Sequence, residues 1–230
     1  MKQLFKLNVM EKNWIEYLEQ LMKQYEKRKH PLDYKNRYQL MVMVILSAQD
    51  SDRHINQLAP AFFEAYPSMN SLVKATSDDL YRYISTVRNF GHKSEWLIKL
   101  AQLIGDDDNI PTTQAELTAL PGIGRKSANV IIRESGSKAE GVIVDLHVVR
   151  VAPRIGIASG TQPEKIEKQI MALVPQDKWN DIGMALSFLG REICRPTDPK
   201  CTVCIMNKVC NYYNGTESKS ERQTSGLTLF

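Results

Sequence analysis

Most hydrophobic positions along this chain recur every three or four residues, which is the spacing of one face of an α-helix. Sustained alternation of hydrophobic and polar residues, which is typical of β-strands, is nearly absent. One short exception, Val142-Ile143-Val144, looks extended and leads directly into Asp145. The periodic stretches predict helices over Trp14 to Tyr25, Leu40 to Leu46, Leu72 to Val87 and Trp96 to Ile104. We therefore expect an all-α fold.

Turn and cap residues separate these stretches. Thr76 and the pair Thr112-Thr113 are each followed by acidic residues, which favours helix starts at both places through side-chain capping and the helix dipole. The sequence contains no internal repeat. Further turns are predicted at Ala59-Pro60, Tyr66-Pro67, Gly91, Gly105, Pro111, Ser135-Gly136 and Pro175. The pattern indicates many medium-length helices joined by tight turns.

Composition places the chain among folded proteins without a membrane segment. Its 230 residues are 43% hydrophobic, which is enough for one large domain or two small ones. The longest apolar run, LMVMVILSA at 40–48, is far shorter than the roughly 20 residues of a membrane-spanning helix. Acidic residues also come too early at the N-terminus for a signal peptide. We expect a cytoplasmic protein, associated with the nucleoid in a bacterium, with no membrane partner.

The net charge of +4 permits a polyanionic partner without requiring one. The local distribution of charge is more informative. The segment from Pro121 to Arg154 contains six cationic residues and three acidic ones, Glu134, Glu140 and Asp145. The cations are Arg125, Lys126, Arg133, Lys138, Arg150 and Arg154. This excess is consistent with binding to nucleic acid.

The segment LPGIGRKSANVI, residues 120–131, combines a glycine turn with the start of a helix. Pro121 starts the turn, and Gly122 and Gly124 permit positive φ while leaving the backbone N–H groups uncovered. Exposed amides at a helix N-terminus bind phosphate oxygens, so this hairpin can grip a nucleic-acid backbone independently of sequence. An ordinary turn between two helices has the same pattern, and the motif alone leaves both interpretations open.

Two residues near the hairpin suggest chemistry. Lys126 lies in the first helical turn, where the helix dipole and Arg125 favour the neutral amine, which can attack an electrophilic carbon and form a Schiff base. Asp145 follows 19 residues later, at the start of another helical stretch, where it can act as a general base or as a helix N-cap. His147 can fix that helix by hydrogen bonding. A solvated lysine and a structural N-cap remain open alternatives.

The four cysteines all lie within the spacing Cys194-x6-Cys201-x2-Cys204-x5-Cys210. Such clustering argues against a general disulfide framework. Four thiolates close a metal site and leave no ligand position for a substrate, so a metal here would be structural. From the spacing alone, an iron–sulfur cluster, a zinc ion and disulfides remain open, in that order of preference.

The glycine hairpin, the segment VDLHVVR and the four-cysteine motif, in this order, resemble the endonuclease III branch of the helix–hairpin–helix (HhH-GPD) DNA glycosylase superfamily. The resemblance spans Tyr38 to Tyr212 and includes Leu46-Ser-Ala-Gln49, similar to the family segment whose glutamine enters the space left by a flipped base. It implies a six-helix barrel lobe with the hairpin over 30–139 and an iron–sulfur lobe built from 1–29 and 140–212. We expect 213–230 to form a flexible tail.

The resemblance also implies the activity. It implies a bifunctional DNA glycosylase and AP lyase of base excision repair, acting as a monomer on oxidised pyrimidines or abasic sites in double-stranded DNA. Lys126 falls on the family's catalytic lysine and Asp145 on its catalytic aspartate. The implied ligands of a [4Fe–4S] cluster are Cys194, Cys201, Cys204 and Cys210. We expect contacts to DNA from Gln49, Asn89, Phe90, Gly122, Gly124, Arg125 and His147.

The sequence departs from the family pattern in three places. The loop that commonly carries a leucine wedge has Arg88, Asn89 and Phe90 instead. Leu146 follows the aspartate where threonine is usual, and Asp198 stands in a loop that is often more positive. The unusual wedge loop and Leu146 keep open a glycosylase of the same fold that is specialised for an alkylated purine or a mismatched base, whereas Asp198 predicts weaker DNA binding by the cluster lobe. A non-catalytic iron–sulfur protein that binds DNA is a second alternative.

Overall fold

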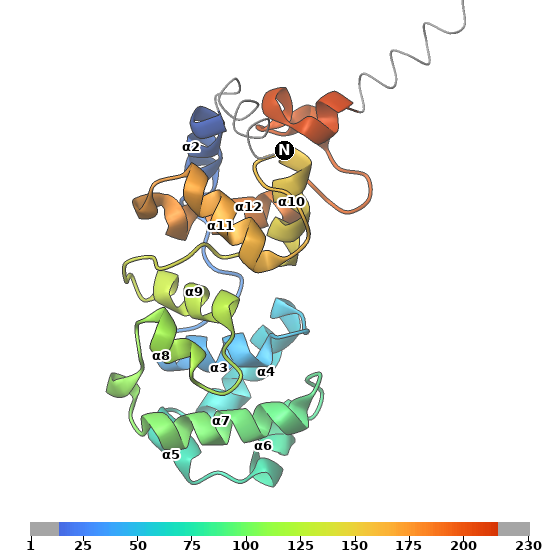
Figure 1. The fold of residues 1–230 in the computed structure, drawn as a ribbon. Helices are drawn as coiled ribbons and strands as arrows, with labels where there is room; N and C mark the ends of the chain where they lie inside the picture. Colours follow the sequence, from blue (N-terminus) through green and yellow to red (C-terminus); the bar gives the residue numbers. More distant parts are fainter. Residues whose placement is uncertain (1–13, 216–230) are drawn as a thin grey trace, which may run out of the picture. The chain divides into compact units, whose positions relative to one another are not determined.

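The computed structural model describes residues 14–215, which contain helices and no β-strand (Figure 1). This confirms the all-α prediction. Residues 211–215 form a last helical segment, and the rest of the tail predicted for 213–230 lies outside the described residues. The α-helices are α2 (Trp14–Tyr25), α3 (Arg37–Leu46), α4 (Asp52–Ala65), α5 (Met69–Val73), α6 (Ser77–Ile84), α7 (Phe90–Ile104), α8 (Gln114–Thr118), α9 (Arg125–Glu134), α10 (Leu146–Ile155), α11 (Pro163–Leu173) and α12 (Trp179–Glu192). Short 3-10 helices are η1 (Asp107–Asn109), η2 (Gln176–Lys178), η3 (Cys201–Val203) and η4 (Asn207–Val209).

The chain divides into two compact units. One unit comprises residues 29–140 and contains α3 to α9. The other combines α2 with the chain from Gly141 onward and contains α10, α11 and α12.

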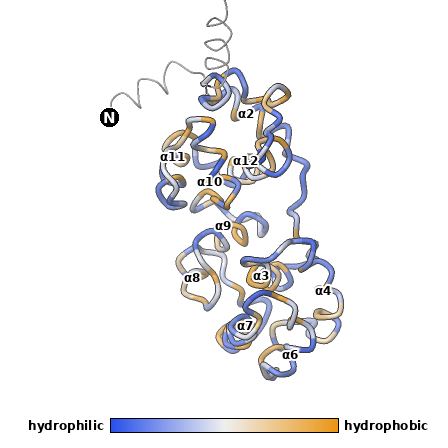
Figure 2. Tube along the Cα trace, turned by 90° about the vertical axis from the view of Figure 1, so that its right-hand side faces the viewer, coloured by the Kyte–Doolittle hydropathy of each residue, from blue (hydrophilic) through white to orange (hydrophobic). Residues whose placement is uncertain are grey.

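Helix α3 is the centre of the unit 29–140. Its side chains from Leu40 to Leu46 are all buried, and it contacts α4, α7 and α9. A helix that is hydrophobic on all sides belongs inside a core, whereas the helices around it are amphipathic. Figure 2 shows their alternating hydrophobic and hydrophilic positions as orange and blue stretches of the tube. The spacing of hydrophobic residues every three or four positions thus corresponds to the amphipathic helices that pack around α3.

The helix predicted over 72–87 is two helices in the structure. Helix α5 ends at Val73 and α6 begins at Ser77, because Thr76 and Asp79 form a capping box. The Asp79 backbone N–H donates to Thr76 Oγ1 at 3.3 Å, and the Thr76 N–H donates to Asp79 Oδ2 at 3.0 Å. The start predicted at Thr76 is confirmed, and Thr113 also caps a helix, because its side chain accepts the Glu116 N–H at the start of α8.

Two predicted turns lie inside helices instead. Pro60 is within α4, and Gly91 is the second residue of α7. A proline removes one helical hydrogen bond, but α4 continues through it because Ile55, Ala59 and Phe62 bury one continuous face of the helix. Local breaking signals are outweighed here by tertiary packing.

The second unit is built around α12. Every residue of α12 from Ile182 to Gly190 is buried, and the helix contacts α2 and α10. The extended run 142–144 is not a strand, because it has no neighbouring strand in the described residues and instead crosses α12 at Gly183. Its first amide is satisfied by a buried side chain, since Val142 N–H donates to Glu167 Oε1 at 3.1 Å.

Gly183 allows this crossing, and its replacement is expected to destabilise the protein. A Cβ atom at Gly183 would lie 2.7 Å from Ile143 O and 2.8 Å from Ile143 N, and backbone atoms cannot turn aside as a side chain can. We expect Gly183→Ala to lower the free energy of unfolding by roughly 1–3 kcal/mol in urea. Gly124→Ala is the control, because Gly124 has negative φ and open space around it. Equal stability of the two variants would contradict the close contact.

Candidate functional site

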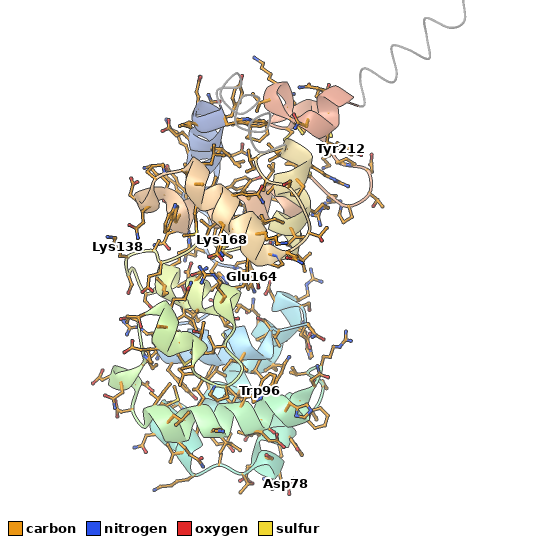
Figure 3. All side chains as sticks on the ribbon, viewed as in Figure 1. Asp78, Trp96, Lys138, Glu164, Lys168 and Tyr212 are labelled. Atoms are coloured by element: carbon orange, nitrogen blue, oxygen red, sulfur yellow. The ribbon has the colours of Figure 1, made fainter. Side chains whose placement is uncertain are left out.

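Helices α8 and α9 are joined by a glycine turn over 119–124, as the sequence predicts. Gly122 has φ +77°, and a Cβ there would lie 2.9 Å from Trp96 Cε3 on α7, so this position requires glycine (Figure 3). Gly124 corrects the prediction, because its φ is −88° and its backbone does not need positive φ. No atom lies within 4 Å of a Cβ built on Gly124. The absence of a side chain at Gly124 therefore leaves the start of α9 open.

The N-terminus of α9 combines uncovered amides with two exposed cations. Gly124 is the N-cap residue and has no side chain to bond the first-turn amides. Arg125 and Lys126 follow it and are both exposed. Partial positive charge from the helix dipole and two cationic side chains favour an anion at this end of the helix.

Arg125 is held by side chains of both hairpin helices. Its Nη1 donates to Gln114 Oε1 at 2.5 Å, and Gln114 Nε2 donates to Asn129 Oδ1 at 2.7 Å. Asn129 is buried, so the network ties α8 to α9 below the turn. Gln114 and Asn129 were not among the predicted site residues. The polar Asn129, at an otherwise apolar helical position, could have been recognised in the sequence.

The surroundings of Lys126 include a neutral histidine. The pKa of His30 is lowered to about 4, mainly by burial; Glu134 and Asp52 oppose this decrease, and the nearby Lys126 and Arg133 add to it. The His30 Nδ1 atom accepts the Leu32 N–H at 3.1 Å. At neutral pH His30 therefore adds no positive charge next to the lysine.

The loops that carry Gln49 and Asn89 present these two side chains to solvent. Both residues have left-handed backbone conformation, with φ of 60° and 58°. Phe90, also predicted to contact DNA, is partly buried and packs edge-on against Tyr81 with ring centroids 4.9 Å apart. Arg88 is exposed beside Asn89. Arg88 and Asn89 are therefore more accessible to a ligand than Phe90.

A buried lysine supports one of these loops and was missed in the sequence. Lys93 is 1% exposed, and its Nζ donates to Leu46 O and Ala48 O, both at 2.7 Å. Burial lowers the pKa of this ammonium, with Asp50 opposing the shift and Arg88 adding to it. The two carbonyl groups lie at the end of α3, where a cation is favourable.

Asp145, in the second unit, is held by three hydrogen bonds. As the N-cap of α10, its Oδ1 accepts the N–H groups of His147 and Val148, both at 2.9 Å. Its Oδ2 accepts the hydroxyl of Ser187 at 2.6 Å, and Ser187 is buried on α12. The carboxylate thus combines the N-cap role with a fixed orientation that suits a catalytic base. Ser187 could only be found from the fold, because it lies 42 residues away.

His147 and Leu146 flank this carboxylate differently. The His147 Nδ1 atom lies 3.3 Å from Arg150 Nη2, and Arg150 donates to Gly190 O at 2.9 Å and to Cys194 O at 3.1 Å. His147 is thereby linked to the first cysteine loop. Leu146 is 71% exposed, which is unusual for a large aliphatic side chain next to a held carboxylate.

The four cysteines line one pocket, and no disulfide joins them. The other lining residues are mostly apolar: Ile155, Leu189, Ile193, Pro199, Asn207, Tyr212 and Tyr213. Burial and the neighbouring cysteines raise the pKa of the Cys201 thiol and raise that of Cys204 to about 11. Over residues 14–215, no three His, Cys, Asp or Glu side chains are arranged around a single metal ion.

Arg154 organises the rim of this pocket. Its guanidinium donates to Arg195 O at 2.7 Å and to Pro196 O at 3.1 Å, and lies 3.7 Å from Cys194 Sγ. It also lies over the ring of Tyr212, 4.8 Å from the centroid. The sequence identified Arg154 only as part of a basic region.

Within each unit the structure gathers a subset of the predicted residues. The unit 29–140 holds Gln49, Asn89, Phe90, Gly122, Gly124, Arg125 and Lys126. The other unit holds Asp145, His147 and the four cysteines. None of the described helices has both the length and the hydropathy of a transmembrane span.

Comparison with known proteins identifies the family. Residues 42–176 match the model of the HhH-GPD superfamily base excision DNA repair protein. The chain is 34% identical to endonuclease III of Synechocystis sp. over 181 residues, covering 78% of this chain and 83% of that protein. It is 35% identical to endonuclease III of Rickettsia felis over 189 residues, covering 81% and 88%.

Solved structures give the same result. The structure of a non-covalent endonuclease III–DNA complex superposes with a TM-score of 0.80 and 28% identity, covering 89% of this chain and 97% of that one. The structure of a trapped endonuclease III–DNA covalent intermediate matches with the same values. The chain therefore belongs to the HhH-GPD superfamily of base excision DNA repair proteins and, within it, to the endonuclease III family.

Proposed function

We propose that this protein is a bifunctional DNA glycosylase and AP lyase that removes oxidised pyrimidines from duplex DNA and cuts the strand 3′ to the lesion. The observation that carries the proposal is the exposed amine of Lys126 at the open N-terminus of α9, in a member of the endonuclease III family. The trapped covalent intermediate of endonuclease III with DNA supports it, because such an adduct requires a nucleophile.

The hairpin would bind the phosphate backbone of the DNA substrate. Amides at the start of α9, together with Arg125, suit a phosphate oxygen and read no sequence. Flipping a nucleotide out of the stack costs a few kcal/mol, and less at a damaged or mismatched base. Gln49 and Asn89, both exposed, are proposed to enter the space that the flipped nucleotide leaves.

The first chemical step is base removal. The Lys126 amine attacks C1′ of the flipped nucleotide through its nitrogen lone pair, the C1′–N bond breaks, and the departing base keeps the electron pair and takes up a proton from water. The Asp145 carboxylate is proposed to accept a proton during this step and to stabilise positive charge on the sugar. Its three hydrogen bonds keep one orientation during this step. The C1′–O4′ bond then breaks, O4′ keeps the electron pair and takes up a proton, and the nitrogen lone pair forms the C1′=N bond of a protonated Schiff base with Lys126.

The second step is strand cleavage. The Schiff base withdraws electrons, so the C2′ proton becomes acidic and is removed. The electron pair forms a C2′–C3′ double bond while the C3′–O bond breaks, and the 3′ phosphate leaves. Hydrolysis of the imine returns Lys126 to the free amine.

The cysteine pocket is proposed to hold a [4Fe–4S] cluster. Four cysteines that line a mostly apolar pocket and form no disulfide fit this group, because cysteine thiolates are the ligands that hold iron–sulfur clusters. When bound, the cluster cross-links the chain between Cys194 and Cys210 and can exchange an electron. With four protein ligands it would leave no position for substrate, so it would shape the loop that Arg154 holds through Arg195 O and Pro196 O.

The metal content distinguishes this cluster from zinc. We expect the purified protein to be brown, with broad visible absorption and about four irons per chain. Cys201→Ser should remove most of the absorption, because one ligand is lost. A colourless protein with stoichiometric zinc would contradict the assignment.

The two compact units are proposed to serve as two lobes of one monomeric enzyme. The unit 29–140 supplies the six-helix barrel and the hairpin, and the other unit supplies the cysteine pocket and Asp145. The partner is double-stranded DNA with a damaged base or an abasic site.

The test of the function is borohydride trapping on a duplex with one oxidised pyrimidine. A covalent protein–DNA adduct is the expected result, because borohydride reduces the Schiff base. An adduct on an abasic duplex alone would keep the lyase chemistry and redirect the glycosylase to an alkylated or mismatched base. An adduct on neither would contradict the proposal.

A further inference from the structure

Two exposed loops of the unit 29–140 share an unusual backbone feature. Gln49 follows α3 and Asn89 precedes α7, and both are non-glycine residues with φ near +60°. In the part of the chain that the structure describes, Asp198 is the one other such residue. A left-handed conformation is unfavourable without glycine, so it persists where surrounding contacts hold it. Both loops must therefore be held by specific contacts.

The carboxylate of Asp50 connects the two loops. Its Oδ2 accepts the N–H of Arg88 at 3.1 Å, although the two residues are 38 positions apart. Its Oδ1 accepts the N–H of Ser51 at 2.7 Å and lies 2.8 Å from His54 Nδ1. Burial by itself would raise the pKa of Asp50, but these hydrogen bonds outweigh burial and lower it. The carboxylate therefore stays charged and strengthens each bond.

Two further contacts reinforce this connection. The Nε2 atom of His54 lies 3.0 Å from Thr86 Oγ1, on the second loop. The buried Lys93, on the helix that follows the second loop, donates to Leu46 O and Ala48 O on the first. The two loops are thus bonded to each other, and the first loop is also bonded to the helix that follows the second. We call Asp50, His54, Thr86 and Lys93 the loop bridge.

We propose that Asp50 is a positioning residue that fixes the two loops together, so that Gln49 and Asn89 enter the duplex as one rigid pair. This inference rests on the proposed glycosylase function and adds Asp50 to the residues that determine its specificity. A preorganised pair loses less conformational freedom on binding than two independent loops. The bridge should therefore favour the flipped state of the nucleotide, while the attack by Lys126 proceeds unchanged once the nucleotide is flipped.

Fluorescence tests the insertion directly. The probe is a duplex with an uncleavable tetrahydrofuran abasic site opposite 2-aminopurine, whose emission rises when side chains unstack it. Asp50→Ala is expected to lose most of this rise and to bind about tenfold more weakly. Thr86→Val, which removes one contact at an exposed position, should fall between Asp50→Ala and wild type.

A matched control is available on α6. Asp79 also accepts a backbone N–H and a hydroxyl, both from Thr76, and it takes no part in the loop bridge. Asp79→Ala should give the wild-type fluorescence. A wild-type signal from Asp50→Ala would overturn the proposal.

Kinetics separate positioning from loss of stability. Cleavage of a base-containing duplex requires flipping, whereas an abasic site flips at low cost. We expect Asp50→Ala to slow the base-containing substrate about tenfold more than the abasic one, at saturating DNA. Equal losses on both substrates with a lowered Tm would overturn the proposal in favour of a purely structural role. If wild type cleaves neither duplex, the proposed function fails, and the fluorescence comparison still decides the loop bridge.

Discussion

Lys126→Ala is expected to abolish the borohydride-trapped adduct and to lower strand cleavage by roughly four orders of magnitude or more. No other amine replaces a nucleophile at the N-terminus of α9, because the neighbouring Arg125 carries a guanidinium that does not lose its proton. The measurement is single-turnover cleavage of an abasic duplex, with the adduct resolved by gel electrophoresis. Binding to an uncleavable abasic duplex should persist, because the amides at the hairpin do not change.

Arg125→Ala is the control for this prediction. It removes a cation from the same helical turn together with the bond to Gln114, so it should weaken DNA binding and still give the adduct. Equal cleavage by Lys126→Ala and wild type would reject Lys126 as the nucleophile. Loss of the adduct in both variants would indicate damage to the hairpin.

Asp145→Asn should lower the rate of base removal by about 10²- to 10⁴-fold while the protein remains folded. Asparagine keeps an oxygen that accepts the two amides of α10, so the N-cap survives. The negative charge is lost, and with it the proton acceptor and the stabilisation of positive charge on the sugar. Single-turnover kinetics on a base-containing duplex measure the rate, and circular dichroism verifies the helix content.

Ser187→Ala separates orientation from charge. It removes the hydroxyl that donates to Asp145 Oδ2 and leaves the carboxylate in place. We expect a smaller loss of rate than in Asp145→Asn, with unchanged DNA affinity. An unchanged rate in Asp145→Asn would assign the carboxylate to the N-cap alone.

Much of the fold follows from local sequence. The helix α2 has the bounds that its periodicity predicts, and Thr76 and Thr113 cap helices where threonine followed by acidic residues predicts a start. These are local effects, because a cap or an amphipathic turn needs residues within four positions. Pro60 shows the limit, since the same local logic predicts a turn inside what is a continuous helix.

The residues of the candidate site were likewise predictable from the sequence only in part. The motifs around Lys126, Asp145 and the cysteines are contiguous in sequence and were found there, and the resemblance to the endonuclease III family was confirmed by comparison. The partners that orient these groups were not found: Ser187 is 42 positions from Asp145, and Arg88 is 38 from Asp50. Nothing in a local pattern indicates which distant group donates to a carboxylate.

By itself, the sequence determined that this protein is helical, where some of its helices begin, and which reactive residues occur in the order of a DNA repair enzyme. Only the tertiary structure decided that Gly124 has negative φ and lies in open space, that Phe90 packs on Tyr81, and that 142–144 is no strand. The physical reason is the distance along the sequence over which each kind of interaction acts. Caps and helical periodicity act over a few residues, whereas burial, close backbone approach and hydrogen bonds between loops depend on groups that only folding brings together.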